Sequence, residues 1–170
     1  MLSENNLSAF KKIKAIILDI DGVLTDGSLL VFENGEQVRK FNIKDGFAMV
    51  TAIKEGIQII VISAGNYEGV RSRLEYLGVQ HIQLGVKDKK SVLQKYMSDF
   101  GWKKDEMLYM GDDLPDYEAI QMVGLPTCPA DACAEIINLC HYISPKKGGE
   151  GAVRDVIEKV LKLQNKWKWS

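Results

Sequence analysis

Short apolar runs alternate with helical patterns along most of the chain. Four runs are rich in β-branched or large apolar side chains: 15–20, 57–63, 81–85 and 107–111. Such runs are typical of strands that are buried on both faces of a parallel sheet. Five further segments have helical spacing: 45–56, 67–78, 89–101, 116–124 and 151–163. The alternation predicts an α/β fold with a doubly wound parallel sheet, whose strands end along one edge.

One stretch interrupts this alternation. Residues 28–43 follow the first strand where a helix is expected, and they hold two extended runs around Asn34-Gly35. Asn-Gly is the strongest short-range signal for a tight hairpin turn. We therefore expect a β-hairpin at about 28–43 that projects beside the end of the first strand. Because an isolated two-stranded hairpin is marginal in water, it favours pairing with hairpins of other subunits.

The composition excludes several classes of function. The chain of 170 residues suits a single domain, 1–170, and its 46% hydrophobic and 26% charged residues are ordinary for a globular protein. Its formal net charge of -1 favours neither nucleic acid nor an anionic membrane as a partner. No apolar run has the length of a membrane span, and the first residues lack a signal-peptide core. Three cysteines without zinc-site spacing are expected to be reduced thiols. We therefore expect a cytoplasmic protein.

Polar side chains follow each of the four predicted strands. In chain order they are Asp19 and Asp21; Ser63, Gly65 and Asn66; Lys87, Lys89 and Lys90; and Asp112, Asp113 and Asp116. Ligands of such folds bind at the carboxyl ends of the strands, so we expect these groups to lie together. Each signal is weak alone: Asp112–Asp116 can be a helix N-cap, and Lys89 can be a solvated helix residue. The combination of all four groups at the strand ends indicates a functional site.

Clustered carboxylates without histidine or cysteine suit Mg²⁺. A carboxylate beside this ion can attack phosphorus and form an aspartyl-phosphate. Ser63 and the amides near Gly65 can hold the phosphoryl group, and a lysine can neutralise its charge. Asp21 can protonate the leaving oxygen and later deprotonate the attacking water.

These motifs resemble those of the haloacid dehalogenase superfamily of phosphohydrolases. The matching stretches are "DIDGVLTD", Ser63 at the end of the second strand, Lys89 in "GVKDKK", and "GDDLPD". The resemblance implies that Asp19 is the nucleophile and Asp21 the general acid and base. It also implies that Mg²⁺ is held by Asp19, the main-chain carbonyl of Asp21, and Asp112. Asp113 and Asp116 are then neighbours of the metal site.

A narrower resemblance covers about residues 14–163. The segments 22–56 and 64–88 are too short to hold a cap domain. With "DIDGVLTDG", "NGE", "FNIKDG", "GDDLPD", "VGL" and "GGEGAVRDV", the chain is similar to the capless 3-deoxy-D-manno-octulosonate 8-phosphate (KDO 8-phosphate) phosphatases. That family implies hydrolysis of a phosphorylated sugar acid in lipopolysaccharide precursor synthesis. It also implies a homotetramer built on the hairpins, with each C-terminal tail reaching a neighbouring site.

The chain departs from the family at two places. The family often has Thr-Gly-Arg after the second strand, whereas this chain has Ser-Ala-Gly-Asn, so Arg71 or Arg73 is expected to replace an arginine at position 66. The departure keeps KDN 9-phosphate open as an alternative substrate, although "KDG" at 44–46 favours the octulosonate. In the tail, 164–170, Trp167 and Trp169 have no evident core role and suggest a subunit interface or disorder.

Two further residues are candidate substrate ligands. Arg154 follows the Gly-rich loop 146–151, whose alternative is an ordinary flexible loop. Asp45 can contact sugar hydroxyls or cap the next helix. Two other classes of protein are also compatible with an acidic cluster. A phospho-receiver domain is disfavoured because the second strand ends without an aspartate, and an inactive scaffold would need none of the motif residues.

Overall fold

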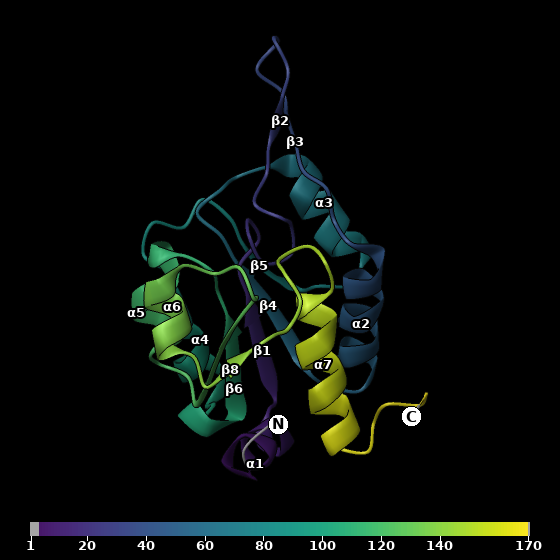
Figure 1. Cartoon of the computed structure of the whole chain (residues 1–170), viewed down its shortest axis with the longest axis vertical. Coiled ribbons are helices and arrows are strands. Elements are labelled where there is room, and N and C mark those ends of the chain that lie inside the picture. The colour runs from purple at the N-terminus through teal and green to yellow at the C-terminus, as the bar shows by residue number, and fades with distance from the viewer. Residues whose placement is uncertain (1–3, 170) are drawn as a thin grey trace.

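A six-stranded sheet lies at the centre of the protein, whose computed structural model describes residues 4–169 (Figure 1). All neighbouring strands are parallel, in the order β5-β4-β1-β6-β7-β8. Their bounds are β1 Ala15–Leu18, β4 Gln58–Ile62, β5 His81–Gln83, β6 Met107–Met110, β7 Leu125–Cys128 and β8 Tyr142–Ile143. The predicted doubly wound α/β fold is confirmed.

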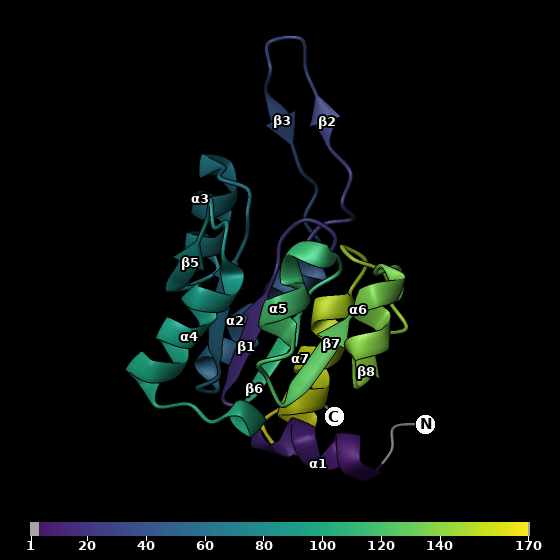
Figure 2. The ribbon, with the colours of Figure 1, turned by 90° about the vertical axis from the view of Figure 1, so that its left-hand side faces the viewer.

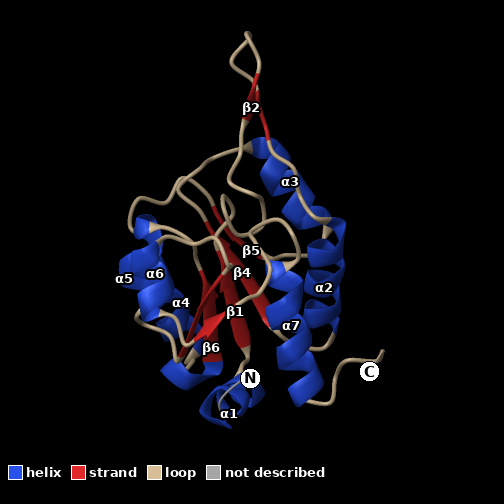
Figure 3. Ribbon diagram, viewed as in Figure 1, coloured by secondary structure: helices blue, strands red, loops and turns tan. Residues whose placement is uncertain are grey.

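Helices cover both faces of this sheet (Figure 3). One face carries α2 (Ile43–Lys54), α3 (Glu68–Tyr76) and α7 (Ala152–Leu163), with α1 (Glu4–Lys12) at the lower end in Figure 1. The other face carries α4 (Lys89–Phe100), α5 (Tyr117–Ile120) and α6 (Ala134–Leu139). Short 3-10 turns lie at Lys104–Glu106 and Leu114–Asp116.

The alternation of side chains in β1 explains its fully apolar sequence. Ile16 and Leu18 pack into the core formed with α2 and α7, whereas Ala15 and Ile17 pack into the core formed with α4 and α5. Successive strand residues point to opposite faces, so a central strand needs apolar residues at every position. Leu18 is paired with Val61 of β4 and Met110 of β6, so the three strands end within one residue of one another.

The chain order around β1 marks the place of a ligand site. From β1 the chain winds outward through β4 and β5, and then returns to β6, β7 and β8 on the other side. Such a reversal leaves a crevice at the carboxyl ends of the strands on either side of it. The residues that follow β1, β4 and β6 therefore face one another.

The predicted hairpin projects from this same edge and stands clear of the helices in Figure 2. It pairs β2 (Leu30–Val31) with β3 (Gln37–Val38) in antiparallel register. Gly35 adopts a positive φ of 84° in the turn, and the N–H of Phe32 donates to the carbonyl of Glu36 at 2.9 Å. Within residues 4–169 no folded cap is inserted beside it, which confirms the prediction of a capless fold.

The structure corrects several predicted elements. The helix expected at 116–124 is only α5, preceded by the 3-10 turn that contains Pro115. Strand β7 was not predicted because Pro126 lacks a donor and usually argues against an inner strand. Helices α1 and α6 and the two-residue strand β8 were not predicted either. Trp167 does have a core role, since it is buried against the core of α2 and α7, and Trp169 packs on Phe47.

No helix in residues 4–169 has both the length and the apolar character needed to cross a bilayer.

Candidate active site

A cavity of about 310 Å³ lies at the carboxyl ends of β1, β4 and β6; we call it the strand-end cavity. It is lined by Asp19, Asp21, Gly22, Gly27, Ser63, Ala64, Gly65, Lys89, Asp112, Asp113 and Pro115. The structure thus brings together polar residues that follow four different strands. This is the arrangement that the sequence predicted for the strand ends.

Lys89 occupies the centre of the charged cluster, at the start of α4. It is only 4% exposed, and its Nζ lies 2.9 Å from Oδ2 of Asp19 and 2.7 Å from Oδ1 of Asp116. Burial lowers the pKa of Lys89, but the charges of Asp19 and Asp116 together outweigh it and raise the pKa above its usual value. Lys89 is therefore a fixed positive charge and not a solvated helix residue.

Asp116 holds this lysine and the adjacent loop in place. Its Oδ1 also accepts a hydrogen bond from the hydroxyl of Tyr109 at 2.7 Å, and its Oδ2 accepts from the backbone N–H of Asp112 at 3.2 Å. A side chain on Gly111 would lie 2.5 Å from the Asp116 carboxyl carbon, so the glycine leaves room for it. Because both of its carboxylate oxygens accept hydrogen bonds, Asp116 stabilises the positions of Lys89 and of the backbone at Asp112.

Asp19, Asp112 and Asp116 together carry more negative charge than Lys89 alone can balance. Burial, followed by the charge of Asp116, raises the pKa of Asp19 to about 7. Burial, followed by the charge of Asp19, raises the pKa of Asp112 to about 8. Oδ1 of Asp112 is buried and has no hydrogen-bond partner among the described residues. Since a buried carboxylate oxygen without a partner is costly, this arrangement calls for a cation.

The ligand atoms fit Mg²⁺. Oxygens of Asp19, Asp112 and Asp116 lie within 4.8 Å of one another. Gly22 has a positive φ of 84°, and a side chain there would lie 1.9 Å from Oδ2 of Asp112, so the main chain after Asp21 comes close to this carboxylate. A set made only of oxygen atoms is typical of a hard divalent cation. Asp19, the carbonyl of Asp21, and Asp112 would hold it.

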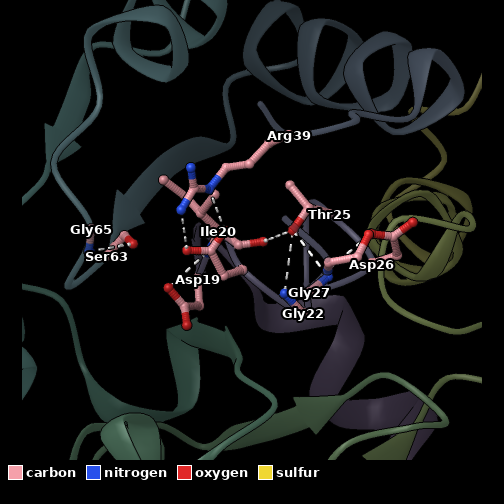
Figure 4. A network of polar contacts seen from close by, with 11 residues as sticks. Asp19, Ile20, Gly22, Thr25, Asp26, Gly27, Arg39, Ser63 and Gly65 are labelled. Carbon is pink, nitrogen blue, oxygen red and sulfur yellow. Dashed lines mark hydrogen bonds and ion pairs between the residues drawn. The ribbon is translucent and has the colours of Figure 1, made fainter. Parts of the chain in front are cut away.

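Ser63 lies beside Asp19 at the end of β4 (Figure 4). Its hydroxyl accepts from the N–H of Gly65 at 3.2 Å, and its own N–H donates to the carbonyl of Gln83 at 2.9 Å. The side chain is buried but borders the strand-end cavity. Ser63 is thus held where it can donate its hydroxyl proton to an anionic ligand.

The loop after Asp21 is held by internal contacts. The buried hydroxyl of Thr25 accepts from the N–H groups of Gly22 and Gly27 and donates to the carbonyl of Ile20 (Figure 4). The Gly-rich loop 146–151 packs against it, and a side chain on Gly148 would lie 1.9 Å from the carbonyl oxygen of Gly22. The Gly-rich loop is therefore a close-packed support and not the flexible loop of the alternative prediction.

Arg39 was missed by the sequence prediction. It follows β3, and its Nε donates to Oδ1 of Asp21 at 2.7 Å. The Arg39 side chain is only 3% exposed, and its guanidinium carbon lies 3.5 Å from the centre of the Tyr67 ring. No local motif marks this arginine, because its contact with Asp21 depends on how the hairpin leaves the sheet edge.

A second cavity of about 620 Å³ lies between the hairpin and α3; we call it the hairpin cavity. Its lining includes Arg39, Asn66 and Arg73. Arg71, the other residue expected to replace an arginine at position 66, is not part of this lining. The structure therefore favours Arg73 as the cation of this region. Asp113, which the sequence placed near the metal, is exposed at the rim of the strand-end cavity.

Asp45 and Arg154 lie elsewhere. Asp45 is only 1% exposed, and its Oδ1 accepts from the backbone N–H of Arg154 at the start of α7. The predicted N-cap role of Asp45 is wrong, since Asn42 caps α2 through the N–H of Lys44. The Arg154 side chain pairs with Glu158. The two residues join α2 to α7 and line neither cavity, so the structure does not bring them to the site.

Several known proteins resemble this chain in sequence and in fold. Residues 82–157 match the haloacid dehalogenase-like hydrolase family. The chain is 32% identical to the 3-deoxy-D-manno-octulosonate 8-phosphate phosphatase KdsC of Yersinia pestis over 154 residues, which are 91% of this chain and 82% of that protein. It is also 32% identical to KdsC of Escherichia coli K12 over 165 residues, 97% of this chain and 88% of that protein.

A crystal structure of the corresponding phosphatase from Moraxella catarrhalis contains a magnesium ion, a phosphate ion and a KDO molecule. It matches this fold with a TM-score of 0.91 at 32% identity, over 96% of this chain and 94% of that one. The fold, the acidic strand-end cavity and the near full-length similarity all support membership of the same family. The chain belongs to the 3-deoxy-D-manno-octulosonate 8-phosphate phosphatase family of the haloacid dehalogenase-like hydrolases.

Proposed function

We propose that this protein is a Mg²⁺-dependent phosphatase that hydrolyses 3-deoxy-D-manno-octulosonate 8-phosphate to KDO and phosphate. The observation that carries the proposal is the buried cluster in which Lys89 joins Asp19 and Asp116 beside the unpaired oxygen of Asp112. This cluster lies at the sheet edge where an α/β fold binds its ligand. The substrate is inferred from the near full-length similarity to the KdsC proteins.

In the proposed first step, a carboxylate oxygen of Asp19 forms a bond to phosphorus, and the bond between phosphorus and the sugar oxygen breaks. Asp21 transfers its proton to that leaving oxygen, so that KDO departs as a neutral alcohol at this position. Lys89 lies next to the attacking carboxylate and can neutralise the phosphoryl oxygens. Ser63 and the amide of the adjoining loop hold the phosphoryl group from the other side.

In the second step, water attacks the phosphorus of the aspartyl-phosphate. Asp21 takes a proton from this water, the bond between phosphorus and Asp19 breaks, and phosphate leaves. Asp21 ends the cycle protonated, as it began. When bound, Mg²⁺ neutralises the clustered carboxylates and binds phosphate oxygens.

The hairpin cavity adjoins the phosphoryl site through Arg39, which lines it and contacts Asp21. We propose that it receives the sugar acid, with Arg73 and Asn66 as its polar contacts. This assignment replaces the broader set that the sequence suggested, because Asp45 and Arg154 are occupied in joining α2 to α7.

We further propose a homotetramer that assembles through the hairpin. Leu29, Leu30, Val31, Phe32 and Val38 are large apolar side chains that this hairpin exposes, with Leu30 and Val31 about 60% exposed. Such a patch at the end of a projecting ribbon is costly in water and favours association with copies of itself. The whole chain, 1–170, would act as one domain per subunit, and we propose that the protein is cytoplasmic.

Phosphate release from KDO 8-phosphate, KDN 9-phosphate and simple sugar phosphates tests the proposed function. We expect Mg²⁺-dependent turnover, with kcat/KM at least about tenfold higher for KDO 8-phosphate than for KDN 9-phosphate. Asp19→Asn should abolish turnover, since an amide cannot attack phosphorus. Undiminished activity of this variant would refute the mechanism, and a preference for KDN 9-phosphate would refute the substrate.

Light scattering tests the assembly. We expect the mass of a tetramer for the purified protein, and a smaller species when Leu30 and Phe32 are both changed to glutamate. A wild-type monomer with full activity would refute the proposed assembly without affecting the chemistry.

A further inference from the structure

We infer that Arg39 is a positioning residue that fixes the carboxylate of Asp21 for proton transfer and so connects the hairpin to the chemistry. The inference rests on the proposed function, in which Asp21 serves as the acid of the first step and the base of the second. It goes beyond that function because Arg39 lies outside the motifs of the strand ends.

The contact between the two residues is short at one oxygen of Asp21 and long at the other, so Oδ2 can still carry the proton that is exchanged. Nε of Arg39 lies 2.7 Å from Oδ1 of Asp21, and Nη2 lies 3.4 Å from Oδ2. Among the described residues, Arg39 is the one cation paired with Asp21. The Asp21 side chain is 39% exposed, so without this fork it would be free to turn toward solvent.

Arg39 is itself held more firmly than its place beside a projecting hairpin suggests. Its guanidinium carbon stacks 3.5 Å from the centre of the Tyr67 ring. That ring lies directly against the backbone of Gly65, because a side chain on this glycine would be 2.3 Å from a ring carbon. A continuous series of contacts therefore runs from the end of β4 through Tyr67 and Arg39 to Asp21.

The remaining guanidinium nitrogen supports a role in positioning. Nη1 of Arg39 is buried and has no hydrogen-bond partner among the described residues. A buried donor without a partner lowers stability, so a gain in stability alone does not explain why this guanidinium is buried here. The position of Arg39 does, however, fix the carboxylate of Asp21.

Orientation matters here because Asp21 must reach two different atoms in turn. It gives a proton to the sugar oxygen in the first step and takes one from water in the second. Proton transfer needs hydrogen-bond geometry, and a misplacement of about 1 Å reduces rates by about 100-fold. Arg39 restricts Asp21 to one region of the strand-end cavity without contacting phosphorus.

The experiment compares three substrates in Arg39→Met: KDO 8-phosphate, a sugar phosphate whose sugar has no carboxylate group, and p-nitrophenyl phosphate. Both sugar phosphates have poor leaving groups, whereas nitrophenolate leaves without a proton. We expect kcat for both sugar phosphates to fall by about 100-fold, with KM changed by less than about threefold. The first turnover of p-nitrophenyl phosphate should fall by less than about threefold. A burst of one nitrophenolate per site should then appear, because hydrolysis of the aspartyl-phosphate still needs Asp21.

Two outcomes would overturn the inference. A loss confined to KDO 8-phosphate, with a raised KM, would make Arg39 a ligand of the sugar acid. An equal loss in all three reactions, the first turnover included, would make it a structural residue. If the wild type acts on sugar phosphates but not on KDO 8-phosphate, the proposed substrate is wrong, and the other two substrates still test the role of Arg39.

Matched variants keep the test valid if Arg39→Met folds poorly. Lys40→Met removes the neighbouring positive charge, which is 78% exposed and pairs with Asp26, and it should leave all three rates unchanged. Tyr67→Leu removes the stack while Arg39 stays, and it should give the same separation between sugar and aryl phosphates. Tyr67→Phe keeps the ring and should give close to wild-type rates; a full loss in this variant would contradict the stacking argument.

Discussion

Two cation–carboxylate pairs lie next to each other in this site and are built in different ways. Lys89 is buried between Asp19 and Asp116, and Asp116 is completely inaccessible to solvent. Arg39 is equally buried, but its partner Asp21 is 39% exposed. The first pair lies within the sheet edge, and the second joins that edge to the hairpin.

The difference follows from what each carboxylate has to do. In the proposed mechanism Asp19 forms a bond to phosphorus, so it must be fixed in a dry place beside a positive charge. In the same proposal Asp21 exchanges protons with a leaving group and with water, so it must lie where both can reach it. The buried lysine therefore depends on the sheet, whereas the arginine depends on the placement of the hairpin.

The largest effect on stability is expected for the inner pair. Lys89→Met removes the cation between two buried carboxylates, and we expect the free energy of unfolding to fall by about 3 kcal/mol, because an unpaired buried charge is strongly destabilising. Urea unfolding at pH 7 without Mg²⁺ measures this loss.

The neighbouring lysine provides the matched control. Lys90 pairs with Glu118, but both side chains are well exposed, at 45% and 71%. Lys90→Met should therefore change the free energy of unfolding by less than about 0.5 kcal/mol. Equal losses in the two variants would mean that the burial of Lys89 has no energetic consequence.

The inner part of the site could be predicted from the sequence because each residue follows a strand. Apolar runs predict the strands, parallel strands end at one edge, and Asp19, Ser63 and Asp112 follow three of them. Even Lys89, which begins a helix, comes a few residues after β5. Local patterns were enough here because the fold itself brings these positions together.

The outer part could not be predicted in this way. The contact between Arg39 and Asp21 depends on how the hairpin leaves the sheet, which no local period encodes. Asp45 and Arg154 looked like substrate ligands, but they join two helices that are far apart in the sequence. Trp167 looked unplaced because its core partners lie in other elements. Tertiary packing decided each of these positions.

A smaller effect is expected in the pH dependence of the free energy of unfolding. It concerns the buried carboxylates around Lys89. The pKa values of Asp19 and Asp112 are raised from 3.8 to about 7 and about 8, so between pH 4 and 8 the folded protein without metal holds protons that the unfolded chain has released. The free energy of unfolding should therefore decrease as the pH rises, by about 2.5 kcal/mol between pH 5 and 6 alone. Mg²⁺, which competes with these protons, should stabilise the protein more at pH 8 than at pH 5.5.

Urea unfolding with EDTA or Mg²⁺ at several pH values measures this dependence. Asp112→Asn should flatten the decrease and make the protein without metal more stable than the wild type at pH 8. A wild-type protein that is more stable at pH 8 than at pH 5.5 without metal would show that these carboxylates are already compensated.

The smallest effect is expected for the outer pair, and it compares the two pairs directly. In a double-mutant cycle with Arg39→Met and Asp21→Asn, we expect a coupling free energy below about 1 kcal/mol, because the partly exposed Asp21 can be solvated when Arg39 is lost. The corresponding cycle with Lys89→Met and Asp116→Asn should give a clearly larger value, since Asp116 has no access to water. A weak coupling in stability beside a 100-fold loss of turnover would place the contribution of Arg39 in the chemistry. A coupling above about 2 kcal/mol would instead make the hairpin pair as much a part of the folded core as the inner one.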